Sequence, residues 1–109
     1  MDSLFKALND PTRRRILDLL RTRSMTAGEI ADECAVARPT MSHHLDLLMR
    51  AELIEQEREG QFRRYHLNTT VVEDVLVWLR GLVADHAQAP ARKAATTPRL
   101  KNLKPRTNS

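Results

Sequence analysis

The segment from Arg38 to Leu48 carries the side chains best suited to chemistry, because it combines an apolar stripe with a polar face. Met41, Leu45 and Leu48 recur at helical spacing, so they are expected to point inward from one short helix. Hydrogen-bonding side chains before and between them are expected to point outward, where they could reach base edges in a DNA major groove. The outward residues are Arg38, Thr40, Ser42, His43 and Asp46.

The helix is expected to span residues 38–50 and to lie in the major groove of double-stranded DNA, with a wing at residues 53–67 alongside. Its start is expected to bind phosphates and base edges. Pro39 suits the first helical turn, where free amide groups and the positive end of the helix dipole attract phosphate. Arg38 is expected to contact phosphate or guanine, and His43 to contact a base or phosphate. Thr40 and Ser42 are expected to bind phosphate or a base edge. The alternative is that these two hydroxyl side chains only solvate the helix start.

Capping residues predict the helices that must hold this segment in place. An amphipathic stretch at residues 3–8 is followed by Asp10 and Pro11, which suit the N-cap and first turn of a second helix. Arg14 and Asp18 have the spacing of an ion pair on the exposed side of that helix. Two short helices are therefore expected before the segment that leads into a third.

A third helix is expected immediately before the DNA-facing one. Thr26 and Glu29 have the spacing of a capping box, and the helix they open should end near Cys34. Residues 35–37 then form the turn of a helix-turn-helix. This turn offers only alanine where a left-handed glycine is common, and a left-handed alanine costs about 1 kcal/mol. We expect the turn to be strained or differently shaped, and we include Thr26 in the predicted DNA surface.

A β-hairpin is expected after the DNA-facing helix. Residues 53–58 and 62–67 read as two strands, and Gly60 lies between them at the tip. A hairpin in this position is the wing of a winged helix-turn-helix, which is the predicted fold class. The complete fold is expected to be mainly α, with about five helices and a two-stranded wing.

The wing carries the second group of predicted DNA contacts. Its tip could enter the minor groove with Gln61, while Arg58 on its flank could touch phosphates. Arg63 and Arg64 are also candidates, but alternation along a strand directs them to opposite sides of the hairpin. Only one of the two is therefore expected to face DNA. The alternative is that these charges protect an exposed edge strand against aggregation.

The last helix has more apolar residues than one packing face requires. Thr70 and Glu73 have the spacing of a second capping box, which predicts a helix that runs to about His86. One side of this helix could pack on the body and another could be covered by a second copy of the chain, although Trp78 could also pack only within its own subunit. The residues predicted to form the homodimer interface are Leu4, Phe5, Leu8, Val75, Trp78, Leu79, Leu82 and Val83.

Charge and length predict one folded domain at residues 1–86 and a disordered basic tail at residues 87–109. The chain has 109 residues and a net charge of +4, but residues 1–86 contain twelve basic and fourteen acidic residues, and the other six basic residues follow. Overall basicity therefore says little about the folded part. A single cysteine excludes an internal disulfide, and no signal peptide or membrane-spanning run is visible, so the chain is expected to be cytoplasmic.

Four segments together closely resemble the ArsR/SmtB-type bacterial repressors, and in particular their SdpR-like autorepressor branch. The segments are residues 5–17, 25–31, 39–45 and 60–62, in the family's order and spacing. The resemblance covers residues 4 to about 83. It implies a homodimeric winged-helix transcriptional repressor that binds imperfect palindromic operator DNA.

Many members of that family sense metals, but their ligand motifs are not present at the matching positions. The third-helix site of the family uses a Cys-X-Cys pair, whereas residues 28–32 contain no cysteine. The last-helix site begins with Asp-X-His, whereas this chain has Asn68-Thr69-Thr70-Val71 there, and Asp85-His86 does not complete a site. His43 and His44 diverge by about 100° around their helix, so they do not converge on one ion. No metal site and no cofactor is therefore expected.

Two other functions remain open at this stage. The acidic body and the missing turn glycine are compatible with a winged-helix module that binds a protein instead of specific DNA. Repression could also respond to an unknown effector, to a protein partner or to the thiol of Cys34, although Cys34 reads more simply as a small buried residue. An enzyme is not expected, because no nucleophile, base and orienting group occur at meaningful spacing.

Overall fold

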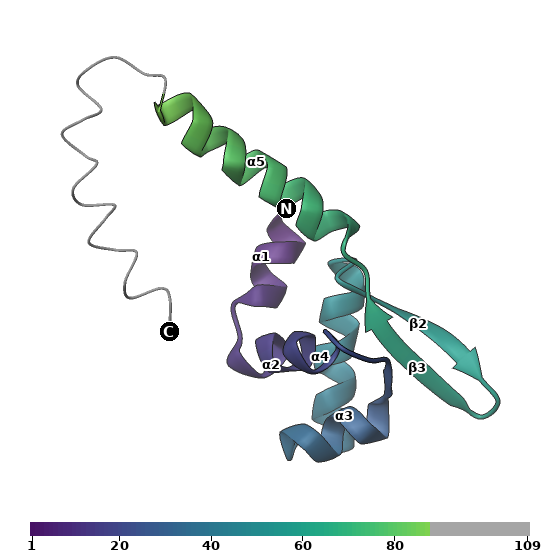
Figure 1. The fold of residues 1–109 in the computed structure, drawn as a ribbon. Helices are drawn as coiled ribbons and strands as arrows, with labels where there is room; N and C mark the ends of the chain where they lie inside the picture. Colours follow the sequence, from purple (N-terminus) through teal and green to yellow (C-terminus); the bar gives the residue numbers. More distant parts are fainter. Residues whose placement is uncertain (88–109) are drawn as a thin grey trace. The chain divides into compact units, whose positions relative to one another are not determined.

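The computed structural model describes residues 1–87, which form five helices and one three-stranded antiparallel sheet. This confirms the predicted winged helix-turn-helix. Figure 1 labels the helices and the two long strands of the sheet. The helices are α1 (Asp2–Leu8), α2 (Pro11–Leu19), α3 (Ala27–Cys34), α4 (Arg38–Arg50) and α5 (Thr70–Ala87). The strands are β1 (Met25–Thr26), β2 (Ile54–Glu59) and β3 (Phe62–Leu67), in the order β1-β3-β2. The basic tail predicted for residues 87–109 lies outside the described residues except for Ala87.

The chain from Met1 to Glu73 forms one compact unit, and a second unit begins at Asp74. Within the first unit, buried apolar side chains from α2, α3, α4 and the sheet make the core. The stripe predicted on α4 is confirmed, since Met41, Leu45 and Leu48 are all buried. The other large, fully buried side chains are Ile16, Met25, Ile30, Leu53 and Ile54.

The predicted caps of α2 and α3 are confirmed. The Asp10 carboxylate accepts from the Arg13 backbone N–H at 3.0 Å, and Pro11 occupies the first turn of α2. Thr26 and Glu29 form the complete capping box: the Thr26 hydroxyl accepts from the Glu29 N–H at 3.2 Å, and the Thr26 N–H donates to the Glu29 carboxylate at 2.9 Å. These side chains satisfy amide groups that a helix start leaves without partners.

The predicted Arg14–Asp18 pair is wrong. Arg14 Nη1 instead donates to the Leu8 carbonyl at 2.7 Å, and Asp18 lies 3.8 Å from Arg21. The Leu8 carbonyl ends α1 and has no partner within its own helix, so a nearby guanidinium gains more there than from an exposed ion pair.

Both helices of the helix-turn-helix end in a left-handed residue that is not glycine. Ala35 follows α3 with φ 54° and ψ 46°, and Glu52 follows α4 with φ 59°. The Val36 N–H donates to the Ala31 carbonyl at 3.1 Å, which closes the end of α3. Of the two expectations for the turn at residues 35–37, the strained left-handed alanine is therefore the correct one.

The sheet and α5 differ in detail from the sequence predictions. β1 pairs with β3 through Met25↔Tyr65 and Thr26↔Arg64, and this third strand was not predicted because two residues carry no periodic pattern. The capping box predicted at Thr70 is wrong by one residue, since Thr70 already belongs to α5. The hydroxyl of Thr69 donates to the Glu73 carboxylate at 2.8 Å instead. No helix among residues 1–87 is long and apolar enough to cross a membrane.

Candidate nucleic-acid interface

The N-terminal half of α4 presents a polar surface to solvent. Arg38, Pro39, Thr40, Ser42 and His43 are all exposed, as predicted from their spacing. The helix spans Arg38–Arg50, as predicted, and its N-cap residue has no side-chain hydrogen bond to the first turn. Amide groups at this end therefore remain available to an anion.

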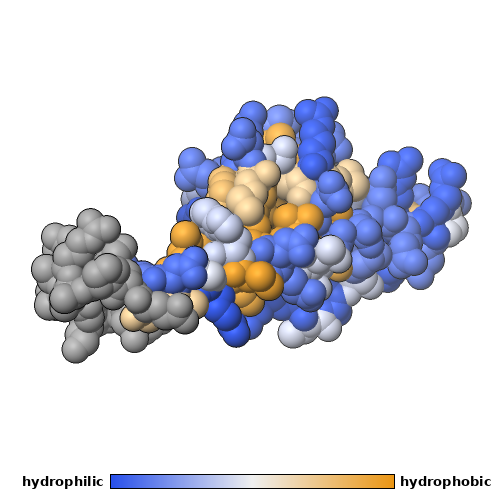
Figure 2. All heavy atoms as spheres, turned by 90° about the horizontal axis from the view of Figure 1, so that it is seen from above, coloured by the Kyte–Doolittle hydropathy of each residue, from blue (hydrophilic) through white to orange (hydrophobic). Residues whose placement is uncertain are grey.

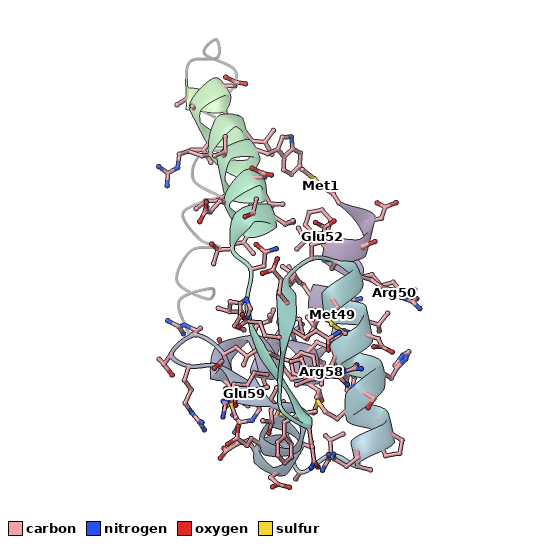
Figure 3. All side chains as sticks on the ribbon, turned by 90° about the vertical axis from the view of Figure 1, so that its right-hand side faces the viewer. Met1, Met49, Arg50, Glu52, Arg58 and Glu59 are labelled. Carbon is pink, nitrogen blue, oxygen red and sulfur yellow. The ribbon has the colours of Figure 1, made fainter. Side chains whose placement is uncertain are left out.

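The exposed stripe continues along α4 beyond the predicted site. Asp46 and Arg50 are exposed, and they follow His43 at intervals of three and four residues, which keeps them on the same side of the helix. Arg50 lies in the last turn of α4, where Figure 3 shows its side chain directed outward. Arg50 was not among the predicted DNA contacts, although its seven-residue spacing from His43 was a signal that could have identified it.

Other residues near α4 are engaged within the chain. The Thr26 hydroxyl is occupied by the capping box of α3. The guanidinium of Arg38 lies over Gly28, where a Cβ would come within 3.2 Å of Nη1. His44 is half-buried and its Nδ1 lies 3.2 Å from Arg13 Nη1. Arg13 itself is buried, although it begins a run of three consecutive arginines, Arg13-Arg14-Arg15.

Strand pairing divides the wing into two faces with different charge patterns. Directly opposed residues share a face, and on the first face Glu55, Glu57 and Glu59 oppose His66, Arg64 and Phe62. Arg64 lies on this first face and is bonded within the chain. Its Nε donates to Glu59 at 2.9 Å and its Nη1 to the Ser24 carbonyl at 3.2 Å, and the bond to Glu59 raises the pKa of Arg64 above its usual value.

The second face of the wing brings two exposed arginines together. Arg58 and Arg63 are directly opposed in the register, and neither has an ion pair within residues 1–87. Like charges in this position repel unless an anion lies between or above them. Figure 3 shows Arg58 near the tip of the hairpin, and Gln61 is exposed in the turn.

Tyr65 connects this second face to the exposed stripe of α4. Burial raises the pKa of the Tyr65 hydroxyl, the positive charge of Arg63 lowers it, and the negative charge of Asp46 raises it. Arg63 on β3 and Asp46 on α4 therefore both lie close enough to Tyr65 to act on its charge. Since α4 also packs against β2, the second face of the wing lies beside α4.

The residues predicted to form a dimer interface differ in exposure. In α1, Leu4 is buried, Leu8 is half-buried and Phe5 is 47% exposed. In α5, Val75 is buried. Hydrophobic atoms are visible between hydrophilic ones on the face drawn in Figure 2. The exposed apolar side chains of α5 are Leu76, Val77, Trp78, Leu79, Leu82 and Val83.

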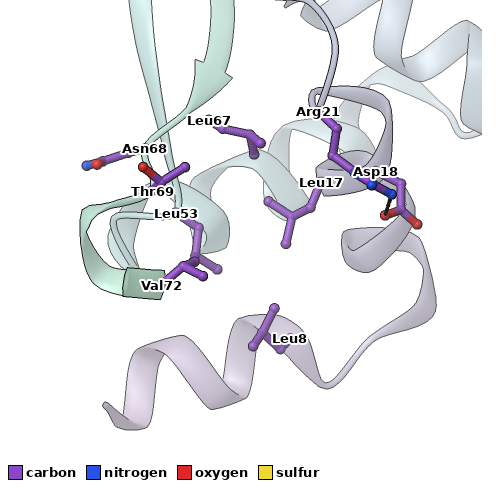
Figure 4. A pocket seen from close by; sticks show the side chains of 9 residues that line it. All are labelled: Leu8, Leu17, Asp18, Arg21, Leu53, Leu67, Asn68, Thr69 and Val72. Carbon is purple, nitrogen blue, oxygen red and sulfur yellow. Dashed lines mark ion pairs between the residues drawn. The ribbon is translucent and has the colours of Figure 1, made fainter. Parts of the chain in front are cut away.

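An apolar pocket of about 170 Å³ opens in the first unit, where α1, α2 and the base of the wing approach one another (Figure 4). The walls are apolar, and polar groups occur at the rim, where Asp18 and Arg21 form their ion pair. The apolar lining residues are Leu8, Leu17, Leu53, Leu67 and Val72.

Metal and thiol chemistry receive little support from the described part of the chain. Across residues 1–87, no three His, Cys, Asp or Glu side chains lie close enough together to hold a metal ion. Burial raises the pKa of the Cys34 thiol, and this effect outweighs the opposing influence of Arg15. A raised pKa leaves less of the reactive thiolate near neutral pH.

Comparison with known proteins gives consistent similarities. A family profile described as a helix-turn-helix domain matches residues 8–57. The transcriptional repressor SdpR of Bacillus subtilis (strain 168) is 49% identical over 83 residues, which are 76% of this chain and 92% of that protein. The relatives are transcriptional regulators and not enzymes, in agreement with the sequence prediction.

Solved structures share the fold over most of the chain. An ArsR-like transcriptional regulator from Rhodococcus sp. RHA1 has a TM-score of 0.76 and 26% identity, and the match covers 94% of this chain and 91% of that one. A homodimeric winged helix-turn-helix DNA-binding domain from Mycobacterium bovis has a TM-score of 0.62 and 31% identity over 79% of each chain.

Proposed function

Because the chain belongs to the ArsR family of winged helix-turn-helix transcriptional repressors, in its SdpR-like branch, we propose that it binds an imperfect palindromic operator as a homodimer. One observation carries this proposal: α4, whose polar face is exposed and whose N-terminus is uncapped, packs against β2 of the wing, on which Arg58 lies opposite Arg63 and both are unpaired. A polar helix that fits a major groove and a neighbouring cationic hairpin are the two parts such recognition needs.

In the proposed complex, the N-terminal half of α4 lies in the major groove. The free amide groups near Pro39, with Thr40 and Ser42, bind phosphate, which fixes the position of the helix on the duplex. Arg38 and His43 then contact base edges or phosphates. An arginine bound to guanine through two hydrogen bonds discriminates between bases by about 1 to 3 kcal/mol.

The wing lies along the backbone beside that groove. Arg58 and Arg63 bind phosphate oxygens, which relieves the repulsion between the two guanidinium groups. Gln61 at the tip reaches toward the minor groove. Only one of Arg63 and Arg64 was expected to face DNA, and we assign Arg64 the supporting role, because its bonds to Glu59 and the Ser24 carbonyl hold the hairpin against the segment that leads into β1.

The homodimer is proposed to form through the apolar face of α5. Trp78, Leu79 and Leu82 are exposed in the single chain, and a second copy would remove them from water. The homodimeric state named for the Mycobacterium bovis domain supports this arrangement. A two-fold dimer would set two copies of α4 about 34 Å apart, one turn of DNA, which explains a palindromic operator.

Repression is proposed to be independent of metal ions at the positions the family uses. The third-helix segment has no cysteine, and the described residues contain no cluster of three ligands. No cofactor is needed for operator binding, which would take place in the cytoplasm. The inducing signal could still be an unknown effector or a protein partner.

Selection from random DNA tests the proposed function without knowledge of the operator. The full chain is incubated with a pool of random duplexes long enough for two half-sites, and bound sequences are enriched, read and then measured by fluorescence anisotropy at physiological salt. We expect an enriched sequence with two-fold symmetry, bound at least about a thousandfold more tightly than a scrambled duplex. Equal affinity for both duplexes would instead favour the protein-interaction module.

A further inference from the structure

Arg13 is the one buried charged residue within the described chain, and its side chain joins three helices. It belongs to α2 and is only 9% exposed. Its Nε donates to the Ala7 carbonyl at 2.8 Å and its Nη2 to the Lys6 carbonyl at 3.1 Å, both in the last turn of α1. Its Nη1 lies 3.2 Å from Nδ1 of His44 on α4.

This arrangement satisfies a charge that would otherwise be costly to bury. An unpaired guanidinium inside a protein is strongly disfavoured, whereas hydrogen bonds in several directions offset its loss of water. The carbonyl of Ala7 ends α1 and has no helical partner, so Arg13 supplies one. The planar guanidinium fixes the directions of its N–H groups, and it therefore fixes α1 and α4 relative to α2.

The contact with His44 requires one particular state of the imidazole. A guanidinium only donates hydrogen bonds, so Nδ1 of His44 must accept, and the neutral ring must carry its proton on Nε2. Protonation would remove the acceptor and place two positive groups 3.2 Å apart. The other charged or titratable groups near the ring are Asp10, whose Oδ2 lies 3.9 Å from Nδ1, and His43, whose ring centre lies 6.2 Å away.

We propose that Arg13 and His44 form a positioning link, which sets the orientation of α4 for DNA binding and holds only while His44 is neutral. The link lies next to the proposed DNA-binding face, because His44 is adjacent to the exposed His43 in the N-terminal half of α4. Arg13 is too buried to bind DNA, so its effect passes through His44. The inference rests on the proposed DNA binding by α4.

Two substitutions of His44 separate this role from packing. His44→Asn keeps a neutral hydrogen-bond acceptor near the position of Nδ1. His44→Leu replaces the ring with an apolar side chain that has no acceptor. With the duplex enriched by the wild-type chain, His44→Leu should bind about tenfold more weakly and His44→Asn within about threefold of wild type.

Nitrogen NMR of the full wild-type chain without DNA gives an independent measurement. We expect the neutral His44 ring to carry its proton on Nε2, and we expect this preference to weaken in Arg13→Lys, whose ammonium lacks the fixed fork of donors. Thermal unfolding of each variant shows whether it is folded, and a folded His44→Leu protein with weakened binding supports the positioning link.

The outcomes against the inference are distinct from failure of the proposed function. If wild type binds its selected duplex and His44→Leu binds equally well, the positioning link is wrong and DNA binding stands. A proton on Nδ1 of neutral His44 would also overturn the link. If the wild-type chain selects no sequence, the proposed function is wrong, and the positioning role of Arg13 and His44 in DNA binding is then wrong as well.

Discussion

Neighbouring arginines in this chain have different roles because the backbone directs them to different surroundings. Arg63 and Arg64 are consecutive in β3, so one lies on the unpaired face of the wing and the other bonds to Glu59 and the Ser24 carbonyl. Arg13 and Arg14 both bind carbonyls at the end of α1, although only Arg13 is buried. Residue type alone therefore does not identify the arginines available to DNA.

The two wing arginines provide a direct test of this division. Arg63→Ala should weaken operator binding and reduce the slope of log affinity against log salt concentration by about 0.9, because one phosphate contact is lost. Arg64→Ala should leave that slope nearly unchanged. Salt titrations followed by anisotropy measure both values, and Arg21→Ala provides a matched loss of an exposed arginine away from the wing. An equal change of slope in both wing variants would contradict the assignment.

Asp46 is a carboxylate on the face proposed to enter the major groove. Such a group repels phosphate but accepts a hydrogen bond from the exocyclic amine of cytosine, so it should lower affinity for most sequences and favour cytosine at one position. Asp46→Asn should bind scrambled duplex more tightly and lose preference at that position. Repeating the selection with this variant measures the change, and an unchanged selected sequence would exclude base reading by Asp46.

At the scale of helices and strands, the turn between α3 and α4 stores strain that a single substitution should release. Ala35 is left-handed, whereas Ala37 has φ −63° and ψ 148° and is unstrained. Ala35→Gly should therefore stabilise the protein by about 0.5 to 1 kcal/mol, and Ala37→Gly should destabilise it slightly. Urea unfolding of both variants measures the difference. Destabilisation by both would show that the turn at Ala35 carries no strain.

The N-cap of α2 should make stability depend on acid. The Arg13 backbone N–H bond lowers the pKa of Asp10 below its usual 3.8. A lowered pKa means that the folded state favours the carboxylate, so this stabilisation is present above the usual pKa and is lost as pH falls through the lowered one. Asp10→Asn keeps a capping side chain and should flatten this part of the pH dependence. Thermal unfolding between neutral pH and strong acid tests the prediction, and an unchanged profile would contradict it.

Local signals in the sequence predicted most helices, and contacts between distant residues account for what was missed. The caps at Asp10 and Thr26 and the stripe on α4 depend on residues within one turn of each other, so they were visible in the sequence. β1 exists only because Met25 and Thr26 meet β3, forty positions downstream for Met25↔Tyr65. Arg13 and His44 are likewise separated by 31 positions, so no local pattern in the sequence indicated their contact.

The candidate site was predictable to a similar extent. Spacing identified the exposed polar residues of α4 and the opposite orientations of Arg63 and Arg64. It could not determine which of the two arginines is paired within the chain, because Ser24 and Glu29 reach Arg64 only through the folded sheet. The start of α5 was misplaced for a local reason, since Thr69 and Thr70 are both threonines able to begin a helix.

At the scale of the whole molecule, operator binding should depend on assembly into a dimer. Trp78, Leu79 and Leu82 leave a single chain with exposed apolar area on one side of α5, which a monomeric protein in water rarely tolerates. Two recognition helices on one particle also bind a palindrome far more tightly than one, because the second contact forms without a second loss of translational freedom. The dimer would therefore contribute both stability and affinity.

Leu82→Glu tests that dependence, because two facing carboxylates at a two-fold interface would lose water and repel each other. Light scattering after size exclusion should change from twice the chain mass of 12.5 kDa to the single mass, and specific binding to the selected palindrome should be lost at the same protein concentration. Ala84→Glu adds the same charge on the side of α5 that carries Glu73 and Arg80, and it should remain a dimer. A Leu82→Glu protein that stays dimeric would place the interface elsewhere, whereas a monomer that still binds the palindrome tightly would separate DNA reading from dimerisation.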